Sequence, residues 1–276
     1  TADPARERLL GVVYTFSAYV LWGFLPLYFL ALAPTGPWEV VGLRVVFSII
    51  FCLVLLTLLR AWPRFLAVAR NRRSLVLTAV AGVLVYVNWQ IFLIGTLSGN
   101  VLETSLGYFI NPLFTVLLAV LVLRERLRIT QWIALGIAGV AVAVIIVGYG
   151  SFPWIALSLA ASFSLYGLVK NRLGPSVDAV SGLTLETFWL LPIAIVQLVI
   201  VQLTTGLTFG TGPAWHTLLL CLAGIVTMTP LLFFAAGARR IPLPFVGRLQ
   251  FIAPTMRSTV GAGPLRVASI GNTTSR

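Results

Sequence analysis

The chain has 276 residues, of which 59% are hydrophobic and only 9% are charged, and its mean hydropathy is +1.02. Too few polar side chains are present to cover a soluble core, so the composition excludes an ordinary soluble protein and predicts a polytopic all-α membrane protein. The formal net charge of +12 is compatible with a nucleic-acid partner, but the arginines separate apolar runs, and this placement argues against nucleic acid.

Nine apolar runs follow in chain order, at 11–30, 39–59, 74–95, 101–123, 129–148, 152–169, 179–203, 215–237 and a shorter 241–256. Most reach the roughly 20 residues that cross a ~30 Å hydrocarbon core. The amino terminus and every second connection carry 14 basic residues, whereas the connections between them carry none. By the positive-inside rule, the amino terminus is predicted to be cytoplasmic, in a multi-pass protein of the cytoplasmic (plasma) membrane.

One motif in the fourth run recurs in the ninth, where Phe109-Ile110-Asn111-Pro112 corresponds to Phe251-Ile252-Ala253-Pro254. Five crossings separate the starts of the two halves, so the halves enter the membrane from opposite sides and form an inverted repeat. The predicted units are 1–148 with five helices, 149–256 with an incomplete second set, and a tail at 257–276. Inverted repeats around a shared site are the architecture of many secondary transporters.

Longer strings extend the pattern through both halves: Trp22-Gly23, Asn88-Trp89, Glu103 to Leu113, Arg124 to Arg128, Gln131-Trp132, Pro153 to Ala156, Ser162 to Gly167, Leu185 to Thr187, Ala238 to Leu243 and Gln250 to Thr255. In this order they resemble the RarD-type branch of the EamA family, in the drug/metabolite transporter superfamily. The resemblance covers roughly residues 10–256. It implies ten helices in two EamA repeats and export of metabolites or drugs; members are often labelled chloramphenicol-sensitivity proteins.

Two features depart from that family pattern. Arg248 stands where the family normally has an apolar or aromatic residue, and the pattern stops after Met256. Residues 257–276 contain no apolar run that could cross a membrane. We therefore expect about nine of the ten helices, with the carboxyl end changed by a truncation or a frameshift.

Ionisable residues inside the runs are costly in lipid and therefore indicate a site or an ion pair. The candidates among them are Glu39, Arg44, Glu103 and Glu186. We interpret Glu39 as an interfacial residue, and Glu103 as either a helix cap or a site residue. Arg44 is predicted to pair with Glu103 near the outer face. Glu186 follows Arg44 at the same separation as the two proline motifs, so it occupies the equivalent place in the second half and is expected to face the inner part of the same cavity.

Polar and aromatic residues that interrupt the same runs complete the candidate substrate pathway. Asn88, Trp89 and Gln90 either line a pocket or bond a neighbouring helix. Pro112 and its counterpart Pro254 are expected to break or kink their helices, because proline removes a backbone hydrogen bond. The full candidate set is Arg44, Glu103, Glu186, Asn88, Trp89, Gln90, Tyr108, Asn111, Trp22 and Tyr166, with Trp22 and Tyr166 expected near Glu186.

Small residues and the single histidine in the apolar runs bear on the expected partners and cofactors. Small residues in the fifth run, among them Gly139 and Ala143, favour close helix packing within the chain or a homodimer. His216 lies at a predicted outer interface and has no second imidazole, so neither a metal nor another cofactor is expected. The expected partners are lipid, a small-molecule substrate and a coupling proton.

The sequence thus predicts a secondary active transporter that exports a small organic metabolite or drug by alternating access. An intramembrane enzyme is the less favoured alternative, because the runs contain no metal cluster and no nucleophile with a recognisable base. A membrane scaffold is the other alternative. A scaffold would need neither an inverted repeat nor buried charges.

Overall fold

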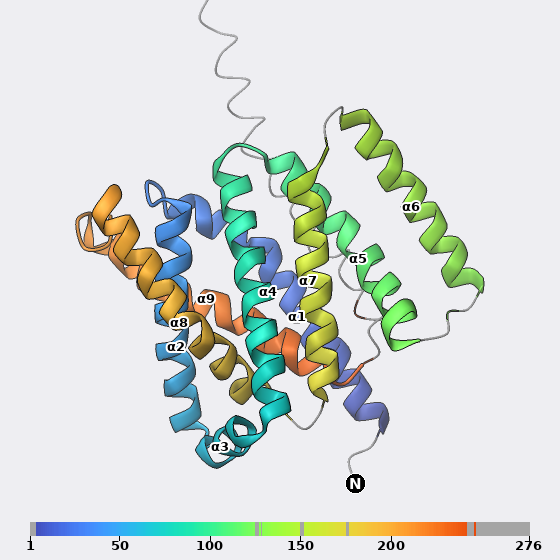
Figure 1. The fold of residues 1–276 in the computed structure, drawn as a ribbon, viewed down its shortest axis with the longest axis horizontal. Coiled ribbons are helices and arrows are strands. Elements are labelled where there is room, and N and C mark those ends of the chain that lie inside the picture. Colours follow the sequence, from blue (N-terminus) through green and yellow to red (C-terminus); the bar gives the residue numbers. More distant parts are fainter. Residues whose placement is uncertain are drawn as a thin grey trace, which may run out of the picture.

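The fold is known from a computed structural model that describes residues 4–124, 127, 129–149, 152–174, 177–241 and 246. The regular elements of these ranges are α-helices that form one bundle (Figure 1). In chain order they are α1 (Pro4–Ala31), α2 (Pro37–Leu58), α3 (Trp62–Arg70), α4 (Arg72–Leu97), α5 (Val101–Leu123), α6 (Ile129–Tyr149), α7 (Trp154–Leu173), α8 (Ala179–Thr204) and α9 (Ala214–Ala238).

The predicted all-α membrane fold is confirmed. Among the described residues, α1, α2, α4, α5, α8 and α9 are long and apolar enough to cross a membrane. Each apolar run from 11 to 237 corresponds to one helix, and α6 stands at the edge of the bundle beside α5 (Figure 1). The ninth run, with Arg248 and Pro254, and the tail at 257–276 lie outside the described residues, apart from Ile241 and Val246.

Helix α3 is the element that hydropathy did not predict. Residues 60–73 form a basic connection in the hydropathy pattern, but Trp62–Arg70 is helical and has Pro63 in its first turn, where proline is tolerated. Its one buried side chain, Val68, packs with Leu173, Val177 and Leu185. A short helix that contains two arginines does not register as a membrane span.

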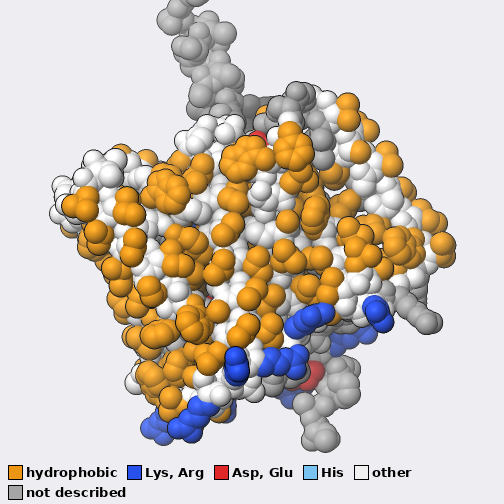
Figure 2. All heavy atoms as spheres, in the orientation of Figure 1, with side chains coloured by type: hydrophobic (Ala, Val, Ile, Leu, Met, Phe, Trp, Pro, Cys, Tyr) orange, Lys and Arg blue, Asp and Glu red, His pale blue; other side chains and the backbone are white. Residues whose placement is uncertain are grey.

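The basic side chains gather at one end of the bundle. Figure 2 shows Lys and Arg along the lower edge of the molecule, at the end where α3 lies, with apolar side chains covering the face above. We name this the basic end; its described arginines include Arg60, Arg64, Arg70, Arg72, Arg73, Arg124 and Arg172. The opposite end holds the α1–α2 and α8–α9 connections.

The helix ends repeat at the same separation as the sequence motif. Helices α1 and α7 end at Ala31 and Leu173, and helices α4 and α9 begin at Arg72 and Ala214, each pair as far apart in the chain as Pro112 and Pro254. The helix contacts also correspond between the proposed halves. The contact of α1 with α9 is matched by the contact of α7 with α4, and the contact of α2 with α9 is matched by that of α8 with α4. These correspondences support the division into units 1–148 and 149–256, which remains a proposal.

Two equivalent glycines bring the halves into close contact. A Cβ atom on Gly82 of α4 would lie 2.9 Å from the carbonyl oxygen of Glu186 in α8. Gly224 of α9 is the counterpart of Gly82 at the repeat separation, and a Cβ atom on it would lie 2.3 Å from the carbonyl carbon of Phe47 in α2. Small residues at such crossings let helix backbones approach within a membrane. These two positions therefore fix how α4 and α9 sit against the opposite half.

We predict that Gly224→Ala destabilises the protein, because the added methyl group would have to displace the backbone of α2. Overpacking of this kind costs roughly 1–3 kcal/mol. The measurement is thermal unfolding of the purified protein in detergent. The matched control is Gly136→Ala in α6, where a Cβ atom meets nothing within 4 Å. Equal melting temperatures for the two variants would contradict the close contact.

Candidate functional site

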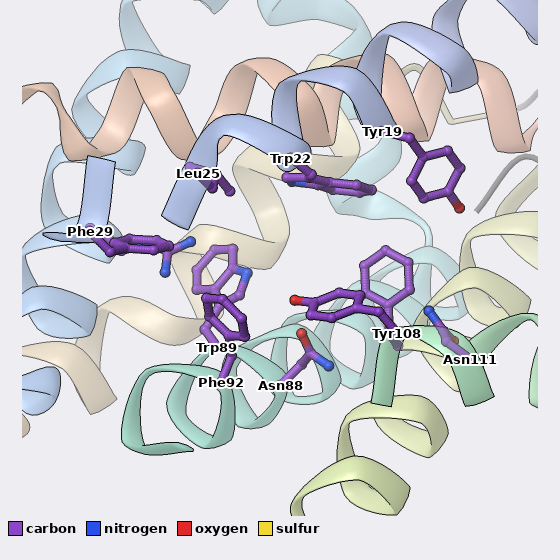
Figure 3. A pocket seen from close by; sticks show the side chains of 11 residues that line it. Tyr19, Trp22, Leu25, Phe29, Asn88, Trp89, Phe92, Tyr108 and Asn111 are labelled. Atoms are coloured by element: carbon purple, nitrogen blue, oxygen red, sulfur yellow. The ribbon is translucent and has the colours of Figure 1, made fainter. Parts of the chain in front are cut away.

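A small cavity of about 40 Å³ lies among the helices of both halves (Figure 3). Helix α1 lines it with an aromatic face, since residues three or four positions apart share one side of a helix. Figure 3 shows these rings opposite side chains from α4 and α5. The complete lining is Tyr19, Trp22, Leu25 and Phe29 of α1, Arg44 of α2, Asn88, Trp89 and Phe92 of α4, Tyr108 and Asn111 of α5, and Phe163 of α7.

The cavity brings together six of the ten candidate residues, while the other four lie elsewhere. The six come from four different helices: Trp22, Arg44, Asn88, Trp89, Tyr108 and Asn111. Glu103, Glu186, Gln90 and Tyr166 are buried but do not line it.

Arg44 is the one charged side chain among the residues that line this cavity, and it is only 2% exposed. Its Nε donates a hydrogen bond of 2.8 Å to the Thr227 hydroxyl on α9. The guanidinium carbon lies 4.5 Å from the centre of the Trp89 ring and 5.0 Å from that of Phe29. Its Nη1 is buried and has no hydrogen-bond partner among the described residues. Ring faces stabilise a cation, but they accept no conventional hydrogen bond.

The predicted pair between Arg44 and Glu103 is wrong. The Oε1 atom of Glu103 instead accepts a hydrogen bond of 2.8 Å from the backbone amide of Ile155, in the first turn of α7. The first amides of a helix lack partners within it and carry the positive end of its dipole, so they attract a carboxylate. Glu103 is therefore a cap, but of the neighbouring helix α7 rather than of its own.

Glu39 is the third residue of α2 and is buried within the protein, while its place at the membrane interface stays a prediction. It is 2% exposed, and its carboxylate accepts bonds from the backbone amides of Thr208 and Phe209, both at 2.8 Å to Oε1. His216 is buried as well, and its Nε2 lies 3.2 Å from the Thr35 hydroxyl. The Thr35 and Thr208 hydroxyls are 2.7 Å apart. These contacts tie the α1–α2 connection to the α8–α9 connection at the end away from α3.

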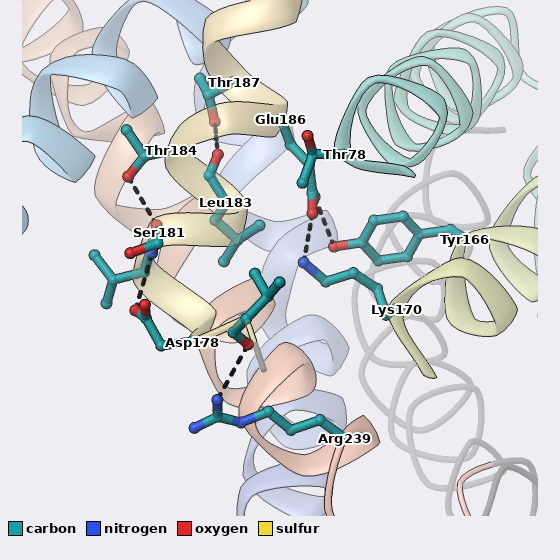
Figure 4. Close-up of polar contacts among 12 residues, drawn as sticks. Thr78, Tyr166, Lys170, Asp178, Ser181, Leu183, Thr184, Glu186, Thr187 and Arg239 are labelled. Atoms are coloured by element: carbon teal, nitrogen blue, oxygen red, sulfur yellow. Dashed lines mark hydrogen bonds and ion pairs between the residues drawn. The ribbon is translucent and has the colours of Figure 1, made fainter. Parts of the chain in front are cut away.

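A second buried cluster lies toward the basic end, between α7 and α8 (Figure 4). Lys170 Nζ is 2.5 Å from Glu186 Oε1, and the Tyr166 hydroxyl donates to Glu186 Oε2 at 3.3 Å. Tyr166 thus meets Glu186 as expected, whereas Trp22 lines the cavity instead. Trp22 is linked to Tyr166 through rings, since Phe234 contacts both of them.

Lys170 is the functional candidate that sequence reasoning missed. It was counted as a basic residue of a connection, because the apolar run ends at 169, but α7 continues to Leu173. One signal was available. Lys170 is the sole lysine of the chain, and it follows Tyr166 by four residues, which places both on one helix face.

The predicted polar patch at 88–90 divides between two faces of α4. Asn88 donates to the Leu159 carbonyl at 3.1 Å and to the Ser162 hydroxyl at 3.0 Å, and so joins α4 to α7 beside the cavity. Gln90 instead lies 3.4 Å from Gln197 of α8.

Helix α5 continues through Pro112, so this proline does not break the helix, and the alternative of a kink stays a prediction. The neighbouring Asn111 side chain accepts a hydrogen bond of 2.6 Å from the Ser164 hydroxyl. The Asn111 side chain therefore links α5 to α7 within a continuous helix.

Membrane-length helices around an internal cavity that contains a buried arginine define a multi-pass α-helical membrane protein. Residues 9–147 match the EamA-like transporter family. The protein RarD of Streptomyces exfoliatus is 40% identical over 93% of this chain and 81% of its own length. The uncharacterized transporter YojE of Bacillus subtilis (strain 168) is 40% identical over 92% of this chain and 85% of its own.

A crystal structure of a protein 18% identical to this chain superimposes with a TM-score of 0.64, covering 93% of this chain and 87% of the other, which shows a shared fold. The chain belongs to the EamA-like transporter family as a RarD-type member, and is a membrane transporter of the drug/metabolite superfamily.

We predict that removing either partner of the Lys170–Glu186 pair is strongly destabilising. Lys170→Met would leave an uncompensated carboxylate among buried groups, which costs roughly 3–5 kcal/mol, and a second change of Glu186→Gln should recover most of the loss. Thermal unfolding in detergent measures both. The control is Arg240→Met, which breaks the more exposed Arg240–Glu7 pair and should cost about 0–1 kcal/mol. A double variant as unstable as Lys170→Met would contradict the pairing argument.

Proposed function

We propose that the chain is a secondary transporter that carries a small organic solute outward across the cytoplasmic membrane by alternating access. The observation that carries this proposal is the cavity around Arg44. Its lining comes from α1, α2, α4 and α5 of the first half and from Phe163 of α7 in the second half, and inverted-repeat transporters bind their substrates where the halves meet. In this proposal the site residues are those that line the cavity, and the Lys170–Glu186 pair belongs to the pathway between the cavity and the basic end.

The size of the cavity supports alternating access. Its volume is about 40 Å³, whereas pockets that hold small organic ligands have roughly 300–1,000 Å³. A solute would therefore bind only after the halves separate at one end. Both ends are held by polar contacts between the halves in the described residues, by Glu39 with Thr208 at one end and by Arg240 with Glu7 at the other. Release of one set at a time would expose the site to one side.

The proposed orientation of the protein in the membrane is based on the distribution of its Lys and Arg side chains. Because Lys and Arg are retained on the cytoplasmic side of membrane proteins, the basic end is proposed to be cytoplasmic, together with the amino terminus (Figure 2). The Glu39 network would then face the outside. A coupling proton is part of the proposal, and Glu186 is the buried carboxylate available to carry it, since it already contacts the hydroxyl of Tyr166.

A scaffold and an intramembrane enzyme are less well supported. A scaffold would have no use for a cation at an internal cavity, because burying a charge in a membrane bundle is costly. An enzyme is less favoured because YojE, with 40% identity, is named a transporter.

Transport by everted vesicles that contain the full-length protein tests the proposed function. We expect energy-dependent uptake of at least one solute from a broad panel of organic metabolites and drugs, and an uptake at least tenfold lower for Trp89→Ala, normalised to protein in the membrane. Trp132→Ala is the control, since this exposed side chain of α6 lies outside the cavity. No uptake of any panel member by the intact protein would favour the scaffold.

The orientation has its own test. In a background with Cys52 and Cys221 replaced by Ala, a cysteine at Gly210 should react with a membrane-impermeant maleimide in intact cells. A cysteine at Asn71, at the basic end, should react only after permeabilisation. The reversed pattern would overturn the assignment of the basic end to the cytoplasm.

A further inference from the structure

The carboxylates of the described residues leave Arg44 without a counter-ion. Each of them has a partner elsewhere: Glu7 with Arg240, Glu39 with Thr208 and Phe209, Glu103 with the Ile155 amide, Asp178 with the Ser181 amide, and Glu186 with Lys170. Asp3 and Glu125 lie outside the described residues. A buried cation without a counter-ion is costly in low dielectric, so the position calls for a negative group.

The donors of Arg44 are arranged to receive such a group. A guanidinium has five N–H donors in a planar fork that matches the two oxygens of a carboxylate. Thr227 accepts from Nε, and the buried Nη1 has no partner in the described part of the chain. The cavity wall beside Arg44 therefore contains a donor whose hydrogen-bonding capacity is unused. A carboxylate bound there would be held by a charge-assisted bond, which is about twice as strong as a neutral one.

The rest of the wall selects for a flat apolar body next to the negative group. Rings from both α1 and α4 line the cavity, Trp22 and Phe29 from α1 and Trp89 and Phe92 from α4 (Figure 3). The rings of Phe29 and Phe92 are in contact, with centroids 5.9 Å apart, so a solute would lie between them only after α1 and α4 separate. Aromatic rings pack favourably on one another when offset or edge-on. No acidic residue is among those that line the cavity. An ammonium group on the solute would thus find no acidic side chain among these residues to pair with.

We propose that the transported solute is an organic monoanion, in which a carboxylate binds Arg44 and an aromatic or other flat apolar part lies between the rings of α1 and α4. This inference rests on the proposed function, because it identifies the substrate class of the same site. It adds that neutral and cationic molecules of the same shape are poor ligands.

Three matched probes test the charge preference on the unmodified protein: phenylacetate, its neutral analogue phenylacetamide and the cation phenethylammonium. Binding to the purified full-length protein in nanodiscs is measured by tryptophan fluorescence and by the shift in melting temperature. We expect phenylacetate to bind at least tenfold more tightly than either analogue. Equal affinity of the three probes, or tighter binding of the cation, would overturn the inference.

Variants then attribute the preference to Arg44. Arg44→Met should weaken phenylacetate binding at least tenfold and remove the difference between phenylacetate and phenylacetamide. Arg44→Lys keeps the charge without the planar fork of the guanidinium, so it should retain part of the preference for phenylacetate over phenylacetamide. It also keeps the inference testable if Arg44→Met fails to fold. The control is Arg172→Met, an exposed arginine at the basic end. Unchanged phenylacetate binding in folded Arg44→Met and Arg44→Lys would overturn the assignment.

The two proposals fail in different ways. If vesicles transport a cation or a neutral solute and phenylacetate does not bind, the transporter function stands and the anion inference is lost. If phenylacetate binds through Arg44 and vesicles transport no solute, the anion site stands and the transport proposal is lost.

Discussion

A hydrocarbon core offers no water to an ionised side chain, so each charge inside this bundle must be satisfied by another group of the protein. Glu39, Glu103 and Glu186 meet that requirement, through backbone amides or a lysine, and each joins two helices or connections of the bundle. Arg44 meets it only partly, with one hydroxyl and two ring faces. The same constraint thus separates the charges that hold the fold together from Arg44, whose counter-ion we propose to be a ligand.

The spans could be predicted from sequence because hydropathy acts on each helix separately. Every apolar run up to residue 237 became a helix, with ends that differ by a few residues except at the start of α1. Helix α3 could not be predicted in this way, because its stability comes from contacts of Val68 with residues of α7, α8 and their connection rather than from its own composition. Several helix ends also recur at the spacing of the repeated motif, as expected for equivalent helices in the proposed halves.

The site was predicted less completely, for a physical reason. Polar and aromatic interruptions of apolar runs, such as Asn88 and Trp89, do mark the cavity, because a bundle tolerates them only at an internal surface. The predicted pair between Arg44 and Glu103 is wrong because a buried carboxylate can be satisfied by the backbone as well as by a charged side chain. The partner of Glu103 is a backbone amide, which every residue type except proline provides and which no sequence pattern reveals.

The contact between Gly82 and the backbone of α8 has a mechanical consequence. Gly82 touches the carbonyl of Glu186, the residue whose side chain holds Lys170, and Gly224 touches α2 at Phe47, three residues after Arg44. In each half, the tightest backbone crossing therefore lies beside a buried charge of the opposite half. A rotation of α4 that widened the cavity would press on the same turn of α8 that anchors the ion pair. Binding of the solute in the cavity and the strength of the Lys170–Glu186 ion pair would then change together. The coupling would pass through the helix contact and would need no loop movement.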